Sequence, residues 1–227
     1  LIVNAALRGP KYTFKDGASI PDLGIGSYDG LTDIRLKADN PDTNGGNLTL
    51  IIAGDGGNNA TNRAIIRFDL SSLSAHSGAQ EAMLTLRVDS IYGPTGADDI
   101  FDLHRIFDTN SGYTESGATW NEQTSGSTAW KNSAGTALPD LGPGGDSTTG
   151  NQADFPYDLT PVASLDYGFH TNAVWLEWII PANVIQSMFN DSNAGFVLRT
   201  RDEDTDGRLA FYSKETAGLG ARLIVVT

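Results

Sequence analysis

Short segments in which apolar and polar residues alternate recur along almost the whole chain, and they decide what it can fold into. Clusters of Gly, Asn, Asp and Pro separate the segments, and the 227 residues include 26 glycines. Alternation with a period of two is typical of β-strands, whose successive side chains point to opposite faces of a sheet. The segments are KYTF, TDIRLKA, LTLIIAG, RAIIRFDL, AMLTLRVDS, DIFDLHRIF, AVWLEWIIP, GFVLRTR, RLAFYSK and ARLIVVT. We therefore predict an all-β protein of about ten strands.

The segment at 63–70 indicates how the strands pack. Ile66 and Phe68 fall on one face of this strand, whereas Ile65 and Arg67 fall on the other. Half-buried alternation of this kind is typical of antiparallel sheets that keep one face in solvent. The pattern predicts an antiparallel β-sandwich of jelly-roll type.

The middle of the chain, 109–154, departs from this pattern. It is too long and too rich in Gly and Ser for one hairpin turn, and loops of this length are either disordered or packed and functional. Because buried indole rings would anchor it, Trp120 and Trp130 predict an excursion that packs on the sandwich. One short helix is predicted over 181–191, with Pro181 at its start.

The first ten residues differ in character from the rest of the chain. We find no linker that divides 11–227, so we predict a single β-sandwich domain there, preceded by an apolar strand and hinge at 1–10. The chain begins without an initiator Met or a basic leader, which indicates a mature chain whose secretion signal has been removed. An apolar terminal strand needs a groove, either in its own sandwich or in a neighbouring copy. The residues predicted to mediate such assembly are Leu1, Ile2, Val3 and Leu7.

Composition argues against several function classes. The formal net charge of -13 disfavours nucleic acid and anionic membrane surfaces, because both attract basic patches. No apolar run approaches the roughly 18 residues that a membrane-spanning helix needs. Cysteine is absent, but a domain of this size does not depend on disulfides, so an extracellular location stays open. The three histidines lie near no nucleophile motif, and we expect no enzyme.

An acidic loop near the C-terminus resembles the first half of a calcium-binding loop. Asp202, Asp204 and Asp206 alternate, and a glycine follows them. The twelfth position counted from Asp202 is Ser213, which cannot supply the bidentate Glu of an EF-hand, and the flanking segments alternate as strands. We predict a hairpin whose three aspartates bind calcium together with a backbone carbonyl near Arg208.

The alternative for this loop is an acidic turn in solvent that flanking arginines neutralise. Arg199 and Arg201 fall on one face of the preceding strand, where they can instead pair with the carboxylate of a uronate. Trp175 and Tyr113 are candidates to stack on a sugar ring. Burial of Trp175 on a strand that is covered on both faces fits its pattern at least as well.

Several segments together resemble the DNRLRE domain, also classed as carbohydrate-binding module family 96. In chain order they are TDIRLKADNPDTNGGNLTLIIAG, NRAIIRFDLSSL, EAMLTLRV, YTESGATWNE and GFVLRTRDEDTDGRLAFYSKE. The resemblance covers 12–226 and implies a secreted, non-catalytic, calcium-associated β-sandwich; members studied as binding modules recognise acidic glycans such as alginate. Two features depart from the family: residues 1–10 precede its pattern, and the net charge is more negative than an alginate binder requires.

Two functions follow from these features. We expect a calcium-stabilised structural protein, extracellular or on the cell surface, whose copies assemble into a filament through the N-terminal strand. The alternative is a module that binds an acidic polysaccharide such as alginate and belongs to a secreted or cell-surface protein.

Overall fold

The computed structural model describes residues 9–55, 61–76, 78–92, 100–142, 150–168, 172–189, 192–203 and 207–227. Thirteen strands lie in these ranges, and every pair that they form is antiparallel. The prediction of an all-β, antiparallel sandwich is therefore confirmed. The strands exceed the ten expected partly because the excursion contributes two short ones, β7 (Glu122–Thr124) and β8 (Thr128–Ala129).

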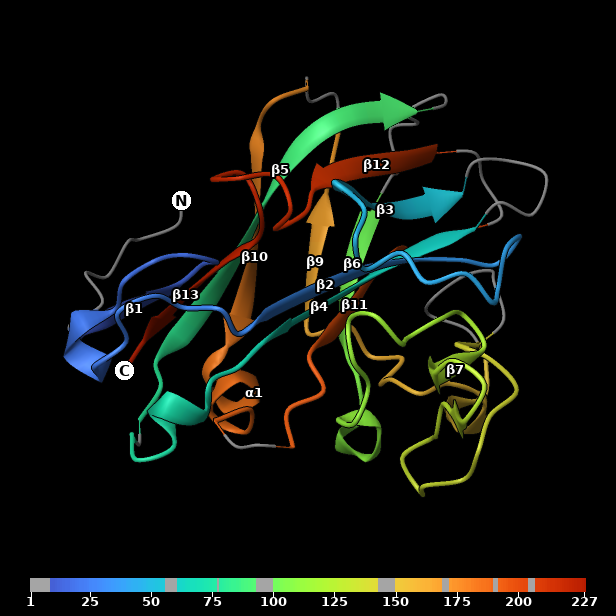
Figure 1. Ribbon diagram of the computed structural model, residues 1–227, viewed down its shortest axis with the longest axis horizontal. Helices are drawn as coiled ribbons and strands as arrows, with labels where there is room; N and C mark the ends of the chain where they lie inside the picture. Colours follow the sequence, from blue (N-terminus) through green and yellow to red (C-terminus); the bar gives the residue numbers. More distant parts are fainter. Residues whose placement is uncertain are drawn as a thin grey trace.

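Two curved sheets share the long strand β5 (Glu81–Tyr92), which passes from beside β13 and β10 to beside β12 (Figure 1). The small sheet contains, in order, β1 (Lys11–Phe14), β13 (Arg222–Val226), the first part of β5, and β10 (Trp175–Pro181). The large sheet continues from the second part of β5 through β12 (Gly207–Tyr212), β3 (Leu50–Asp55), β4 (Asn62–Phe68), β11 (Phe196–Thr200), β6 (Ile100–Arg105) and β9 (Ala163–Asp166). Strand β2 (Leu31–Lys37) pairs with β4.

Helical segments are few and short in the described ranges. The single α-helix, α1 (Ala182–Gln186), follows Pro181 as predicted but is shorter than the segment 181–191, because Met188 and Phe189 turn into the core instead of extending it. No helix in these ranges has the length and apolar character to cross a membrane. The 3-10 turns are η1 (Pro21–Leu23), η2 (Ser71–Leu73), η3 (Asp108–Asn110) and η4 (Gln152–Asp154).

The main core fills the space between the two sheets. Leu84 and Leu86 of β5 and Trp178 of β10 point into it, as do Ile66 and Phe68 of β4, which the alternation places on one face. The indole Nε1 of Trp178 donates a hydrogen bond to the carbonyl oxygen of Phe101 on β6, at 3.1 Å. This bond joins the small sheet to the large one across the core, and it satisfies the polar atom of a buried ring.

A second core lies on the other face of the large sheet. The excursion, drawn green to yellow around β7 in Figure 1, covers this face and buries Trp120 and Trp130 against it, as predicted. Ile65 of β4 and Val197 of β11 are fully buried beneath it. The expectation that one face of β4 stays in solvent is therefore wrong for Ile65. The excursion packs on that face and buries the side chain.

Burial on both faces gives β4 a testable property. Ile65→Ala and Ile66→Ala should each lower the free energy of unfolding by about 2–5 kcal/mol, because each removes methyl groups from a packed core. Leu48→Ala, at a side chain that is 45% exposed, should change it by about 0.5 kcal/mol or less. Urea unfolding measures all three. If Ile65→Ala behaved like Leu48→Ala, the second core would be contradicted.

Candidate functional site

One carboxylate of the acidic loop is turned into the protein. Glu203 is fully buried and accepts hydrogen bonds from Nε and Nη2 of Arg63, at 2.9 and 2.8 Å. It also accepts one from Nη2 of Arg199, at 2.8 Å. Nη1 of Arg199 donates to the hydroxyl of Tyr157. Arginines therefore neutralise Glu203, but they do so in the interior and with Arg63 of β4 besides the flanking Arg199, which differs from the solvent-exposed turn that the sequence offered as the alternative.

Arg63 joins this ion cluster to the excursion. Its Nη1 donates to the carbonyl oxygens of Leu141 and Gly142, at 2.9 and 3.2 Å, and its guanidinium lies 4.7 Å from the ring centre of Trp120. Burial disfavours the charged guanidinium, but the adjacent Glu203 carboxylate outweighs it and raises the pKa of Arg63. The residue stays charged, and its five N–H donors serve both the loop and the excursion.

Two of the residues predicted to contact a glycan are buried, so the prediction is wrong for them. Arg199 is buried beneath the excursion and Tyr113 within it, and the Tyr113 hydroxyl donates to the carbonyl oxygen of Ala194. Neither side chain presents a surface to a polysaccharide. Arg201 is 33% exposed but binds Asp102 through Nε and Nη2, both at 2.9 Å. Its charge is already paired.

The predicted calcium ligands are only partly described. Asp204 and Asp206 lie outside the described residues, and Asp202 is exposed at the start of the turn. Arg208 is half-buried, with its guanidinium 4.8 Å from the ring centre of Tyr92. The residues predicted to mediate assembly lie outside the described ranges as well: Leu1, Ile2, Val3 and Leu7. Calcium at this loop and the donated strand both stay predictions.

Trp175 lies half-buried on the outer face of the small sheet between two arginines. Arg87 stands directly opposite it on β5, with its guanidinium 6.0 Å from the indole ring centre. Arg222 of β13 also lies against the indole, with its guanidinium 4.0 Å from the ring centre. We call these three side chains the Trp175 surface. Cation–π attraction holds both guanidinium groups against the indole.

The two arginines of the Trp175 surface have no carboxylate partner among the described residues. Neither forms an ion pair within the described ranges, and the Nε atom of each is buried there without a hydrogen-bond partner. Arg222 donates through Nη2 to the carbonyl oxygen of Gly218, at 3.1 Å. Glu177 is exposed on the same face, opposite Thr85. The arrangement offers two positive charges beside an aromatic ring.

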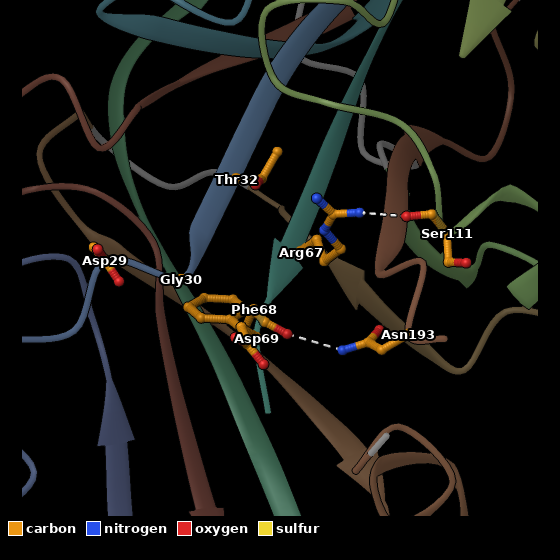
Figure 2. Close-up of a pocket in the computed structure, with 8 residues that line it drawn as sticks. All are labelled: Asp29, Gly30, Thr32, Arg67, Phe68, Asp69, Ser111 and Asn193. Carbon is orange, nitrogen blue, oxygen red and sulfur yellow. Dashed lines mark hydrogen bonds between the residues drawn. The ribbon is translucent and has the colours of Figure 1, made fainter. Parts of the chain in front are cut away.

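A polar groove of about 540 Å³ opens between β2, β4 and the excursion (Figure 2). Arg67 points across it and donates through Nη1 to the carbonyl oxygen of Ser111, at 2.9 Å. The amide of Asn193 donates to the carbonyl oxygen of Phe68, at 2.8 Å. Asp29 and Asp69 also line the groove. Two carboxylates against one engaged guanidinium suit a polar ligand but oppose an acidic one.

An acidic cluster that the sequence analysis did not identify lies at β2. Asp33, Glu115 and Glu215 each place a carboxylate oxygen within 4.8 Å of the others. The ammonium group of Lys214 binds Glu115 Oε2 and, at 3.0 Å, the carbonyl oxygen of Leu31. Burial raises the pKa of Asp33 to about 7, and burial also raises the pKa of Glu115. Oxygen ligands of this kind suit a hard cation.

Comparisons with known proteins do not assign this sequence to a family. No protein-family model matches the sequence, and no curated protein matches it either. The resemblance to the DNRLRE domain therefore rests on the sequence motifs alone.

The buried ion cluster predicts an unequal response to the loss of two carboxylates. Glu203→Gln should lower the free energy of unfolding by about 3–5 kcal/mol, because it leaves two buried guanidinium groups without their counter-charge. Asp108→Asn, which breaks the exposed pair with Arg105, should cost at most about 1 kcal/mol. Chemical unfolding of both variants measures this. Equal losses would show that Glu203 is not the electrostatic centre of the second core.

Proposed function

We propose that the protein is a non-catalytic module, extracellular or on the cell surface, that binds an acidic polysaccharide through the Trp175 surface. The function that the sequence motifs imply and the side chains of this surface point to the same class of ligand. A uronate residue combines a carboxylate with a ring whose C–H groups form an apolar face. Arginine binds the carboxylate with paired N–H donors, and an indole packs against the ring.

One observation carries this proposal. Arg87 and Arg222 flank Trp175 without an ion pair in the described ranges, in a chain whose net charge is -13. Two such cations side by side repel each other unless an anion or an aromatic face compensates. The indole compensates in part, and it also restricts the side chains to positions from which they can bind a ligand. Less ordering entropy is then lost on binding.

The polar groove is a weaker candidate for the same ligand. Its guanidinium, from Arg67, already donates to a backbone carbonyl, and the aromatic rings of Phe68 and Tyr113 beside it are buried. Asp29 and Asp69 would repel a uronate at close range. The Trp175 surface has the opposite balance of charge.

Binding of alginate oligosaccharides should depend on the Trp175 surface. Arg87→Ala and Arg222→Ala should each weaken binding about tenfold, since each removes charge-assisted hydrogen bonds of about 1.5–3 kcal/mol. Trp175→Ala should weaken binding at least as much, because it also releases both guanidinium groups. Glu177→Gln should strengthen binding, because it removes a negative charge on the same face. Isothermal titration calorimetry at low salt measures each affinity.

Arg208→Ala is the matched control for the arginine variants. It removes the same charge and the same kind of cation–π contact, with Tyr92, from another face, and should leave affinity unchanged. Melting temperatures near that of the wild type would show that the variants remain folded. If Arg208→Ala weakened alginate binding as much as the other two arginine variants do, the loss of affinity would reflect net charge and not the Trp175 surface. Wild-type protein that does not bind alginate, or that binds a neutral glucan equally well, would overturn the proposed function.

Self-assembly into a filament is a second candidate, and the open edge of β10 favours it. Among the described strands, β10 hydrogen-bonds to β5 alone. Its Ile179 is 52% exposed and stands in register with Met83 of β5, which in turn faces Ile224 of β13. An unpaired edge beside an apolar row is a surface on which an extended strand can pair. The occupant that we propose is the apolar segment 1–7 of a second copy.

Electron microscopy and sedimentation of two variants test this candidate. Deletion of 1–8 should abolish polymers because it removes the donated strand. Ile179→Lys should do so as well, because it places a charge on the accepting face. Leu48→Lys changes a residue of similar exposure in the segment that precedes β3, and it should leave assembly intact. Polymers that persist after both of the first changes would exclude strand donation to β10.

A further inference from the structure

Three segments that are distant in the sequence meet at the free edge of β2. Among the described strands β2 pairs with β4 only, and the backbone N–H of Asp33 points away from β4 to Oε1 of Glu115, at 3.4 Å. Glu115 belongs to the excursion, while Lys214 and Glu215 belong to the connection between β12 and β13. The backbone N–H of Lys214 donates to Oδ2 of Asp33, at 2.9 Å. The acidic cluster therefore joins both sheets and the excursion.

The charges in this cluster do not balance. Three carboxylates share the single ammonium group of Lys214, so the ionised cluster carries two excess negative charges. Only Glu215 is exposed, and Asp33 is fully buried. Like charges this close raise the free energy of the folded protein unless a cation offsets them. A divalent cation in the place of the ammonium group would offset two of the three negative charges instead of one.

Asp33 supplies an independent observation. Its Oδ2 accepts the hydrogen bond from Lys214, but Oδ1 is buried and has no hydrogen-bond partner among the described residues. A buried carboxylate oxygen without a partner is costly, and native proteins rarely leave one unsatisfied. Metal coordination is one of the ways in which such an atom is satisfied.

We propose that Asp33, Glu115 and Glu215 bind one calcium ion, with the carbonyl oxygen of Leu31 as a further ligand. The set contains oxygen ligands only, which selects a hard cation. Its members come from a strand, an excursion and a connection, and calcium accepts such irregular geometry where magnesium demands a near-ideal octahedron. Without the ion, the ammonium group of Lys214 occupies part of this site, because it binds Glu115 and the carbonyl oxygen of Leu31, two of the proposed ligands.

The backbone around Glu115 is built to hold this position. The amide of Asn44 donates to the carbonyl oxygens of Glu115 and Ala118, at 2.7 and 2.6 Å. Gly46 packs so closely that a Cβ atom there would lie 2.2 Å from the Glu115 carbonyl oxygen. Only a residue without a side chain fits, so Glu115 is fixed beside β2 before any ion binds. Calcium would tie the excursion to the edge of the large sheet.

Calcium titration of the full chain tests this proposal by calorimetry and by melting temperature. Calcium should raise the melting temperature of the wild type, since it binds the folded state. Asp33→Asn and Glu215→Gln should each lower calcium affinity by about tenfold or more and reduce the shift. Glu215 is exposed, so its variant remains informative if Asp33→Asn fails to fold. Lys214→Met removes the competing ammonium group and should bind calcium more tightly than the wild type.

Asp202→Asn is the matched control, because it removes one carboxylate from the acidic loop and leaves the cluster intact. It should keep the calcium affinity that Asp33→Asn and Glu215→Gln lose. A wild type that binds no calcium at millimolar concentration would overturn the proposal, as would Asp33→Asn and Glu215→Gln variants with wild-type affinity. Loss of binding in Asp202→Asn alone would assign the ion to the acidic loop instead. Equal affinity for magnesium would contradict the choice of calcium.

Discussion

The buried carboxylate of Glu203 organises the outer half of this protein. It binds the guanidinium groups of Arg63 and Arg199, and Arg63 in turn binds backbone carbonyls of the excursion. A charge this deeply buried is tolerable only when its partners are complete, so β4, β11, the acidic loop and the excursion must all be in place together. The second core, with Trp120 and Trp130, forms around this cluster.

The position of the excursion decides which surfaces remain for a ligand. It covers the outer face of β4 and β11, where it takes Arg199 out of solvent, and its own Tyr113 is buried. The outer face of the small sheet has no such cover in the described ranges, and there Ile179 is 52% exposed. For this reason we place the proposed polysaccharide contact at Trp175.

The excursion is held at two places by opposite electrostatic arrangements. At the Glu203 cluster, two guanidinium groups share one carboxylate, and the excess charge is positive. At β2, three carboxylates share the ammonium group of Lys214, and the excess is negative. The first arrangement is complete with protein atoms, because carbonyl oxygens and aromatic rings surround the extra cation. The second leaves a buried Asp33 oxygen without a hydrogen bond in the described chain.

Much of the fold could be predicted from local pattern. Alternation with a period of two identified most of the described strands and placed Ile66 and Phe68 on one face of β4, and both side chains lie in the main core. Side-chain direction along a strand depends on the backbone alone, so this much can be predicted locally. Trp120 and Trp130 predicted that the excursion packs, since long Gly- and Ser-rich loops rarely carry indoles that stay in water. The short helix began where Pro181 placed it and ended early, because its end depends on core contacts.

The candidate sites needed tertiary structure. Arg87, Trp175 and Arg222 come from three strands that are far apart in sequence, and only the register between β5, β10 and β13 brings them together. Likewise, nothing local distinguishes Arg63 or Asp33 from an ordinary polar residue on a strand. The sequence by itself determined that this chain forms antiparallel strands with a packed excursion. Which polar side chains are buried, paired or left at the surface was decided by long-range strand pairing, because the partners of a charge are set by neighbours in space rather than along the chain.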